Sequence, residues 1–360
     1  MITGNKGEWS ELYVLLRLLA DGKLYAADAD LHKLDQVYFP ILAILRQELE
    51  SGKMEYRLNE KRREVTLYWN GDKIKSIGSD KLSEYADSFY SGILAGNRSS
   101  FAIPNAEKMM EDIKCTKIKA PSSDKTDITL RVYDRKTGFS SVVGYSIKSE
   151  LGNAPTLLNA SGATNFRYMV TGLTEEAIRS VNGIDTKAKM RDRINTIEQC
   201  GSLKFDRACN NVFSGNLLLI DSMMEDIISF MLLEYYKNGL SFCSEITTAL
   251  ERRDPLGYHR EGVYRYKIKK FLCAVALGMM PSKKWSGQDE ANGGYIIVKE
   301  SGEVLAYHLY NRNMFENYLL NNTKLERKRL WLIKKNLITA VLVLKESSIG
   351  LKNILLWGQY

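Results

Sequence analysis

Apolar residues recur every three or four positions in some parts of the chain and at every second position in others. Near the start, Leu12, Leu15 and Leu19 fall on one side of a helical pattern, and Gly22 follows as a typical stop signal. The pattern therefore predicts an amphipathic helix that ends at Gly22.

Alternation with a period of two residues predicts three β-hairpins. The first pairs residues 54–58 with 64–70, and the last spans 294–310 and turns at Ser301 and Gly302. The clearest one lies between them, where the segments DITLRVYD and FSSVVGYSIKS flank the turn RKTG.

Helical spacing accounts for much of the remaining chain. It predicts helices over residues 36–51, with Pro40 near the start, over 80–95 and near 312–321, and a mostly helical region between about 173 and 275. Helices interleaved with hairpins favour an α/β fold, in which a mixed β-sheet core is flanked by helices.

Three parts are expected on this basis. Residues 1–170 would hold the N-terminal helices and the sheet core. Residues 171–290 would form a mostly helical region, a possible subdomain for contact with a partner or for dimerisation, and residues 291–360 a hairpin, a helix and a tail. The three parts could equally form one compact domain.

Composition narrows the possible chemistry. The 360 residues carry a net charge of +8 and a pI near 9.0, which favours an anionic partner such as nucleic acid. The five cysteines form no CxxC pair and the three histidines have no metal-ligand spacing, so we expect a reducing, cytoplasmic setting. Any metal would then be held by carboxylates, which favours Mg²⁺. No apolar run is long enough to span a membrane.

The central hairpin places charged residues together. If the turn is centred after residue 136, opposed residues sum to 273, and Asp127 lies opposite Ser146. Ser146, Lys148 and Glu150 then share one face, with Lys148 diagonal to Asp127. A shift of one residue would destroy this arrangement, so the inference depends on the turn.

The first helix adds two acids to the apolar stripe that runs through Leu12. Glu8 and Glu11 head this stripe, where carboxylates are costly unless a cation or Lys148 pairs with them. The alternative is that they stabilise the positive end of the helix dipole. Metal-assisted phosphodiester cleavage needs carboxylates to hold the ion and a lysine beside the phosphate.

These residues resemble the PD-(D/E)XK nuclease signature, with Asp127 as the first acid and Lys148 as the lysine. Ser146 departs from it, because that position usually holds Asp or Glu. The resemblance implies that the backbone carbonyl of Ile147 also binds metal. Glu11 or Glu8 would supply the missing carboxylate, and Glu150 is a weaker candidate.

Longer strings resemble the HpaII family of type II restriction endonucleases. They are GNKGEWSELYVLLRLLADGKLYAAD, GYSIKSELGNAPTLLNASGATNF, FSGNLLLIDSMMEDI and GGYIIVKESGEVLAYHLYNRNMFENYLLNNTKLE. The resemblance implies a restriction-endonuclease-like core and Mg²⁺-dependent cleavage of double-stranded DNA that leaves a 5′-phosphate. It implies a short palindromic site such as CCGG, a homodimer and a methyltransferase that protects the same site. The tail after Glu326 departs from the family pattern.

Three segments carry candidate DNA contacts. They are Asn159, Ser161, Thr164 and Asn165 in the loop after Lys148, Arg252, Arg253 and Arg260 in ERRDPLGYHREGVYRY, and Lys283 and Lys284 in PSKKWSG. The first segment could instead be a turn that caps the next element, and the last a plain surface connection. Because Ser146 replaces an acid, a catalytically inactive DNA-binding protein is the alternative to a nuclease.

Overall fold

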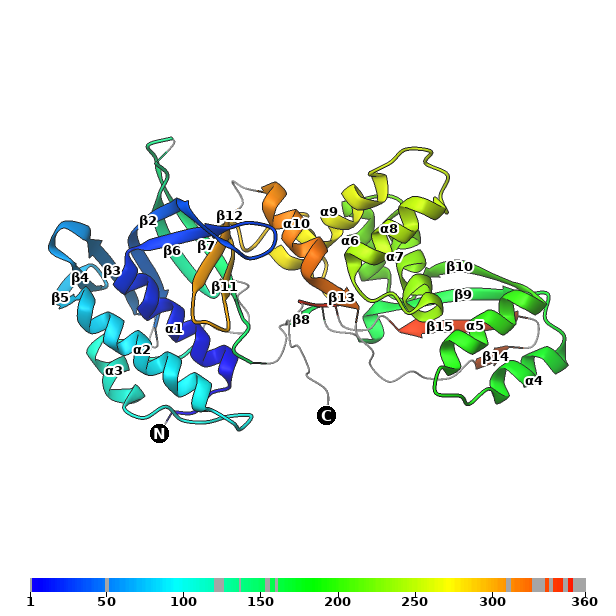
Figure 1. The fold of residues 1–360 in the computed structure, drawn as a ribbon, viewed down its shortest axis with the longest axis horizontal. Helices are drawn as coiled ribbons and strands as arrows, with labels where there is room; N and C mark the ends of the chain where they lie inside the picture. The colour runs from blue at the N-terminus through cyan, green and yellow to red at the C-terminus, as the bar shows by residue number, and fades with distance from the viewer. Residues whose placement is uncertain are drawn as a thin grey trace. The chain divides into compact units, whose positions relative to one another are not determined.

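The fold was analysed in a computed structural model. The residues that it describes are 2–48, 52–119, 126–135, 137–152, 156–158, 161–308, 312–325, 334–336, 339–345 and 349–351. They form two compact units (Figure 1). The first unit consists of described residues within 1–155 and 290–318, and the second of those within 156–289 and 319–354.

A mixed sheet forms the centre of the first unit. Its strands are β1 (Lys23–Ala27), β2 (Lys33–Gln47), β3 (Lys53–Asn59), β4 (Glu64–Trp69), β5 (Asp72–Gly78), β6 (Ile128–Tyr133), β7 (Ser140–Ser149), β11 (Gly294–Val298) and β12 (Val304–His308). Their order is β1-β12-β11-β7-β6-β2-β3-β4-β5, and β1 also pairs with β2, so the sheet curls. The pairs β7–β11 and β1–β12 are parallel, and the other pairs are antiparallel. The predicted α/β class is therefore confirmed.

Helices cover one face of this sheet. They are α1 (Lys6–Asp21), α2 (Ser79–Ala95) and α3 (Ala106–Asp112), and Figure 1 shows them on the same side of the strands. The predicted first helix is confirmed: Asn5 and Glu8 form a reciprocal capping box at its start, and Gly22 ends it with a φ of 67°. Apolar side chains of α1 and the sheet strands share one buried core.

The predicted helix over residues 36–51 is wrong, because β2 occupies this region as far as Gln47. The stretch VYFPILAIL is rich in β-branched and aromatic residues, which fit a strand, and a short apolar run cannot separate the two structures by its period. Pro40 lies where β2 leaves β1 and begins to pair with β6. A residue without an N–H is tolerated at such a change of partner.

The second unit combines helices with two small sheets. The helices are α4 (Glu175–Gly183), α5 (Lys189–Cys200), α6 (Asn211–Ile220), α7 (Met224–Leu233), α8 (Cys243–Arg253) and α9 (Val263–Leu277). The strands are β9 (Asn165–Thr171), β10 (Ser202–Ala208), β14 (Lys334–Asn336) and β15 (Thr339–Lys345) in one sheet, and β8 (Thr156–Leu158), β13 (Thr323–Leu325) and β16 (Ile349–Leu351) in the other. Described parts of the tail after Glu326 thus pair with β9, β8 and β13.

The helix α10 (Arg312–Asn322) follows the predicted hairpin of β11 and β12, and both predictions are confirmed. Phe315 of α10 packs edge-on against Tyr295 of β11, with ring centroids 5.1 Å apart. The described part of the chain contains no helix with the length and apolar character needed to cross a membrane.

Candidate active site

Asp127 lies at the start of β6 and is bonded to the neighbouring strand. Its backbone N–H donates to the carbonyl of Tyr145 at 2.9 Å, which continues the ladder between β6 and β7. Its Oδ2 accepts hydrogen bonds from Ser146 Oγ at 3.1 Å and from the backbone N–H of Ile147 at 2.6 Å. The carboxylate therefore ends the ladder in place of a backbone carbonyl and fixes the strand just before Lys148.

The predicted register of this hairpin is confirmed. Ile128 pairs with Tyr145 and Thr129 with Gly144, and each pair sums to 273. Asp127 and Ser146 therefore lie opposite each other. Lys148 follows on the same face of β7, because side chains two residues apart point the same way.

Tyr295, which sequence reasoning missed, lies beneath the lysine. It pairs with Ser146 across the parallel contact between β7 and β11, and Lys148 Nζ lies 5.5 Å from the centre of its ring. The ring is 1% exposed and is held in turn by Phe315. A buried aromatic face attracts a cation, so the ring holds Lys148 at this place on the sheet.

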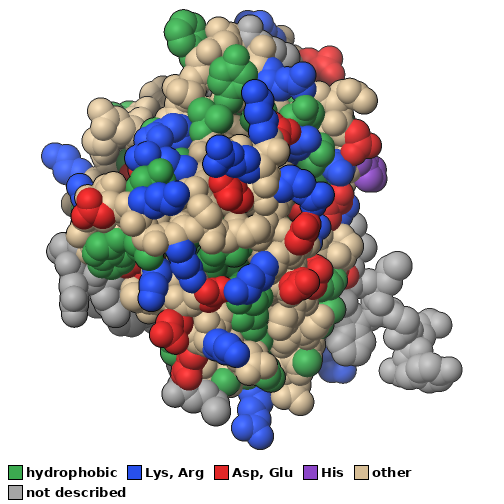
Figure 2. Space-filling model, turned by 90° about the vertical axis from the view of Figure 1, so that its left-hand side faces the viewer, with side chains coloured by type: hydrophobic (Ala, Val, Ile, Leu, Met, Phe, Trp, Pro, Cys, Tyr) green, Lys and Arg blue, Asp and Glu red, His purple; other side chains and the backbone are tan. Residues whose placement is uncertain are grey.

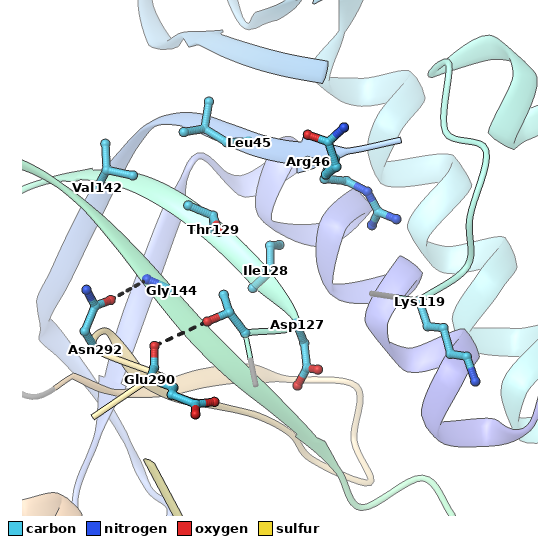
Figure 3. A pocket seen from close by; sticks show the side chains of 12 residues that line it. Leu45, Arg46, Lys119, Asp127, Ile128, Thr129, Val142, Gly144, Glu290 and Asn292 are labelled. Carbon is cyan, nitrogen blue, oxygen red and sulfur yellow. Dashed lines mark hydrogen bonds between the residues drawn. The ribbon is translucent and has the colours of Figure 1, made fainter. Parts of the chain in front are cut away.

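A pocket of about 430 Å³ opens beside Asp127 (Figure 3). Lys119, Thr129, Glu290 and Asn292 contribute to its lining. The segment of Glu290 and Asn292 is tied to the hairpin of β6 and β7, since Asn292 Oδ1 accepts from the N–H of Gly144 at 2.9 Å. Glu290 therefore adds a second carboxylate to the pocket.

Lys119, which lines this pocket, pairs with Glu8 of α1 and lies near the charge of Glu11. Lys119 Nζ donates to Glu8 Oε1 at 2.5 Å, and the nearby charge of Glu11 also raises the pKa of the lysine. The other oxygen of Glu8 accepts from the backbone N–H of Asn5 at 2.9 Å. Burial raises the pKa of Glu8, but the bonds from Lys119 and Asn5 outweigh it and lower the pKa. Glu8 is thus committed to capping and ion pairing, while Glu11 is half-buried on the same helix.

Glu150 lies apart from this arrangement. Its backbone N–H donates to the carbonyl of Val298, and burial, together with the charge of Glu300, raises the pKa of its carboxyl. A carboxyl that is held closer to neutrality is a poor ligand for a hard cation.

The donor set around Asp127 suits magnesium better than zinc. Within the described residues, no group of three or more His, Cys, Asp or Glu side chains is arranged to hold a metal. Magnesium is usually bound by one or two carboxylates together with oxygens of the substrate phosphate rather than by a full protein cage. Asp127 and Glu290, which line the pocket, supply carboxylates of this kind.

The polar loop after β7 serves mainly to cap its own structure. Asn159 lies outside the described residues. Ser161 and Thr164 form a reciprocal capping box around a short 3-10 helix, Gly162–Thr164. Thr164 is fully buried, so it has no surface to offer to DNA, and Asn165 begins β9 half-buried.

The predicted basic contacts lie in the second unit. Arg252 and Arg260 are exposed. Arg253 is also exposed, and it pairs at 3.1 Å with Glu234, whose side chain is almost completely buried.

Lys283 and Lys284 are exposed on a loop that the sequence did not mark as ordered. Asn216, which is 2% exposed, donates to the carbonyl of Lys283 at 2.8 Å and accepts from the N–H of Trp285 at 2.9 Å. The loop therefore presents both lysines from a fixed position.

Comparison with known proteins places the chain among characterised sequences. The family model described as HpaII restriction endonuclease matches residues 5–329. The type II restriction enzyme HpaII of Haemophilus parainfluenzae is 40% identical over 330 residues, which is 90% of each chain. No solved structure gave a significant match. The chain therefore belongs to the HpaII restriction endonuclease family.

Proposed function

We propose that this protein is a type II site-specific deoxyribonuclease that cleaves double-stranded DNA at a short palindrome such as CCGG and leaves a 5′-phosphate. Family membership supports the reaction class. The observation that carries the residue assignment is the hydrogen-bonded pair of Asp127 and Ser146, with Lys148 next on the same face of β7.

Asp127, the Ile147 carbonyl and Glu11 would hold Mg²⁺. The bound ion would polarise the scissile phosphate and lower the pKa of the attacking water. Both oxygens of Glu8 already accept hydrogen bonds, so a cation bound there would have to displace Lys119 or the N–H of Asn5.

Lys148 would face the phosphate and stabilise the negative charge that develops on it. The Tyr295 ring holds the ammonium group in place from beneath. Ser146 donates to Asp127 and so orients this carboxylate instead of supplying a second one.

The partners follow from the palindromic site. A two-fold symmetric site is read by a two-fold symmetric protein, so we propose a homodimer that works in the cytoplasm. A methyltransferase that modifies the same site would protect the host DNA. Exposed basic residues such as Arg252, Arg260, Lys283 and Lys284 are candidates for contacts with the duplex.

Digestion of a plasmid of known sequence tests the reaction. We expect a discrete set of fragments in Mg²⁺ and intact plasmid in EDTA, and mapping the fragment ends identifies the site and the 5′-phosphate. Lys148→Ala should abolish cutting while leaving binding largely intact. The matched control is Lys108→Ala, which changes an exposed lysine on α3. Cleavage by Lys148→Ala at the wild-type rate would overturn the assignment.

The helix acids are tested as a pair. Glu11→Gln should reduce cutting strongly, whereas Glu8→Gln should act mainly through a loss of stability, which thermal unfolding measures. Near-normal cutting by Glu11→Gln would exclude it as a ligand.

One observation favours a second function. The hydroxyl of Ser146, in place of an acid, leaves the hairpin with a single carboxylate, as expected of an inactive protein that only binds DNA. Specific retention of a duplex without cutting, in several divalent metals, would establish that alternative.

A further inference from the structure

In the strands β6, β2, β3 and β4, the two faces of the first unit's sheet differ in character. Met54, Tyr56, Val65 and Leu67 point into the core beneath α2 and α3. The side chains between them point the opposite way, and those of Lys53 and Arg57 are exposed. We define the open face as Lys53, Glu55 and Arg57 of β3, Glu64, Thr66 and Tyr68 of β4, and Thr129 and Arg131 of β6.

The strand register arranges the open face in rows that begin at the active site. Asp127 immediately precedes β6, and Thr129 and Arg131 follow it on the same face. Arg131 and Arg57 flank Ala43 of β2, since each pairs with it from one side. Four residues of an antiparallel strand span about 14 Å, which is the distance along β6 from Asp127 to Arg131.

Hydrogen bonds hold the cations of this face in fixed positions. Glu55 accepts from Arg57 Nη2 at 2.8 Å and from Arg131 Nη1 at 3.0 Å. The Arg57 guanidinium also stacks on the ring of Tyr68 at 4.0 Å. Both arginines remain partly exposed, with 48% and 38% of their side-chain surface accessible, so their outer N–H groups face the solvent.

The open face is continuous with the pocket beside Asp127. A second hollow of about 570 Å³ reaches Lys53 and Glu55. The two hollows share part of their lining, namely Leu45, Arg46, Gln47 and Thr129. Figure 2, which looks toward the side where β4 and β5 lie, shows Lys and Arg side chains gathered over the upper part of the surface, among fewer acids.

We propose that the open face binds the phosphate backbone of the DNA duplex that flanks the cleaved bond. This inference rests on the proposed function, because it places the scissile phosphate at Asp127. A duplex carries one charge per 1.7 Å of its axis, so the 14 Å from Asp127 to Arg131 lies beside about eight phosphate charges. Lys53, Arg57 and Arg131 complement that charge, while two acids of the face are already paired: Glu55 with both arginines and Glu64 with Arg62.

The salt dependence of DNA binding tests the surface in a Lys148→Ala background, where the duplex stays intact. Each phosphate contact adds about 0.9 to the slope of log affinity against log salt. Between about 50 and about 200 mM salt, Arg57→Gln should therefore lose about 3.5-fold less affinity than the background protein. Arg131→Gln should behave in the same way.

A second variant changes the charge of the open face in the opposite direction, and so distinguishes a role in DNA binding from a purely structural role. Glu55→Gln removes one acid from the face and should raise the affinity for DNA. The control Lys108→Gln changes an exposed lysine on α3, outside the face, and should leave the slope unchanged. Thermal unfolding checks that each variant is folded.

Unchanged slopes for both arginine variants would overturn the proposal. So would weaker binding by Glu55→Gln, because the network would then only stabilise the sheet. Failure of the proposed function is distinct, since it is read from plasmid cutting by the otherwise unaltered protein. If the protein binds DNA with these slopes but never cuts it, the proposed DNA-binding surface stands and the proposed nuclease activity is refuted.

Discussion

His308 makes folding of the first unit sensitive to acid. The residue ends β12, is 2% exposed, and stacks on Phe39 with ring centroids 4.6 Å apart. Burial lowers the pKa of His308 to about 4, against the opposing charge of Asp134. Between about pH 6.5 and about pH 4, the unfolded chain therefore binds a proton that the folded chain refuses, so stability falls as the pH is lowered through this window.

The size of this effect follows from the shift. A difference of about 2.5 pKa units at 1.36 kcal/mol each gives about 3 kcal/mol in total, of which about 2 kcal/mol is lost by about pH 5. Urea unfolding at several pH values, compared between the wild type and His308→Phe, isolates this contribution from that of the carboxylates. As the pH falls, the unfolding free energy of the wild type should decrease by this amount relative to that of His308→Phe.

A direct titration can refute the reasoning. The chain has three histidines, and His32 and His259 are exposed, so ring-labelled NMR spectra contain one buried signal and two internal references. A His308 midpoint near the ordinary value of about 6.5 would contradict the predicted burial effect.

Further predictions concern single contacts. Tyr295→Leu should slow cutting about tenfold by releasing Lys148, whereas Tyr295→Phe should keep the rate, and cleavage time courses measure both. Gly293→Ala should lower stability by about 1–3 kcal/mol, because its Cβ would lie 2.8 Å from a backbone carbonyl of β7. In contrast, Gly215→Ala, in an open stretch of α6, should be neutral or stabilising by up to about 1 kcal/mol, as thermal unfolding would show. Asn5→Ala should cost about 1 kcal/mol through loss of the helix cap, and unchanged urea unfolding would contradict this.

Local rules were sufficient for the central hairpin. A short turn fixes the register, and a period of two fixes the face, so the position of Asp127 opposite Ser146 could be worked out from the chain alone. The capping sequence at the start of α1 could also have been read, since Asn5 precedes Glu8 by three residues. Such a capping sequence predicts a structural role for Glu8.

Other features depend on contacts between distant segments. Tyr295, Glu290 and Asn292 reach the site because β11 pairs in parallel with β7, although residues 156–289 separate the two strands in the sequence. No local pattern states which strand becomes that neighbour. The helix predicted around Pro40 is wrong for the same reason, because the strand that forms there depends on partners that lie far away in the sequence.

The discontinuous first unit has a consequence for biosynthesis. During translation, β7 emerges long before β11, and residues 156–289 must be added between them. At about 5–20 residues per second this takes roughly 7 to 27 seconds, during which β7 remains an edge strand and Lys148 lacks the aromatic ring beneath it. The order of synthesis therefore delays completion of this part of the sheet, with Tyr295 beneath Lys148, until most of the chain exists.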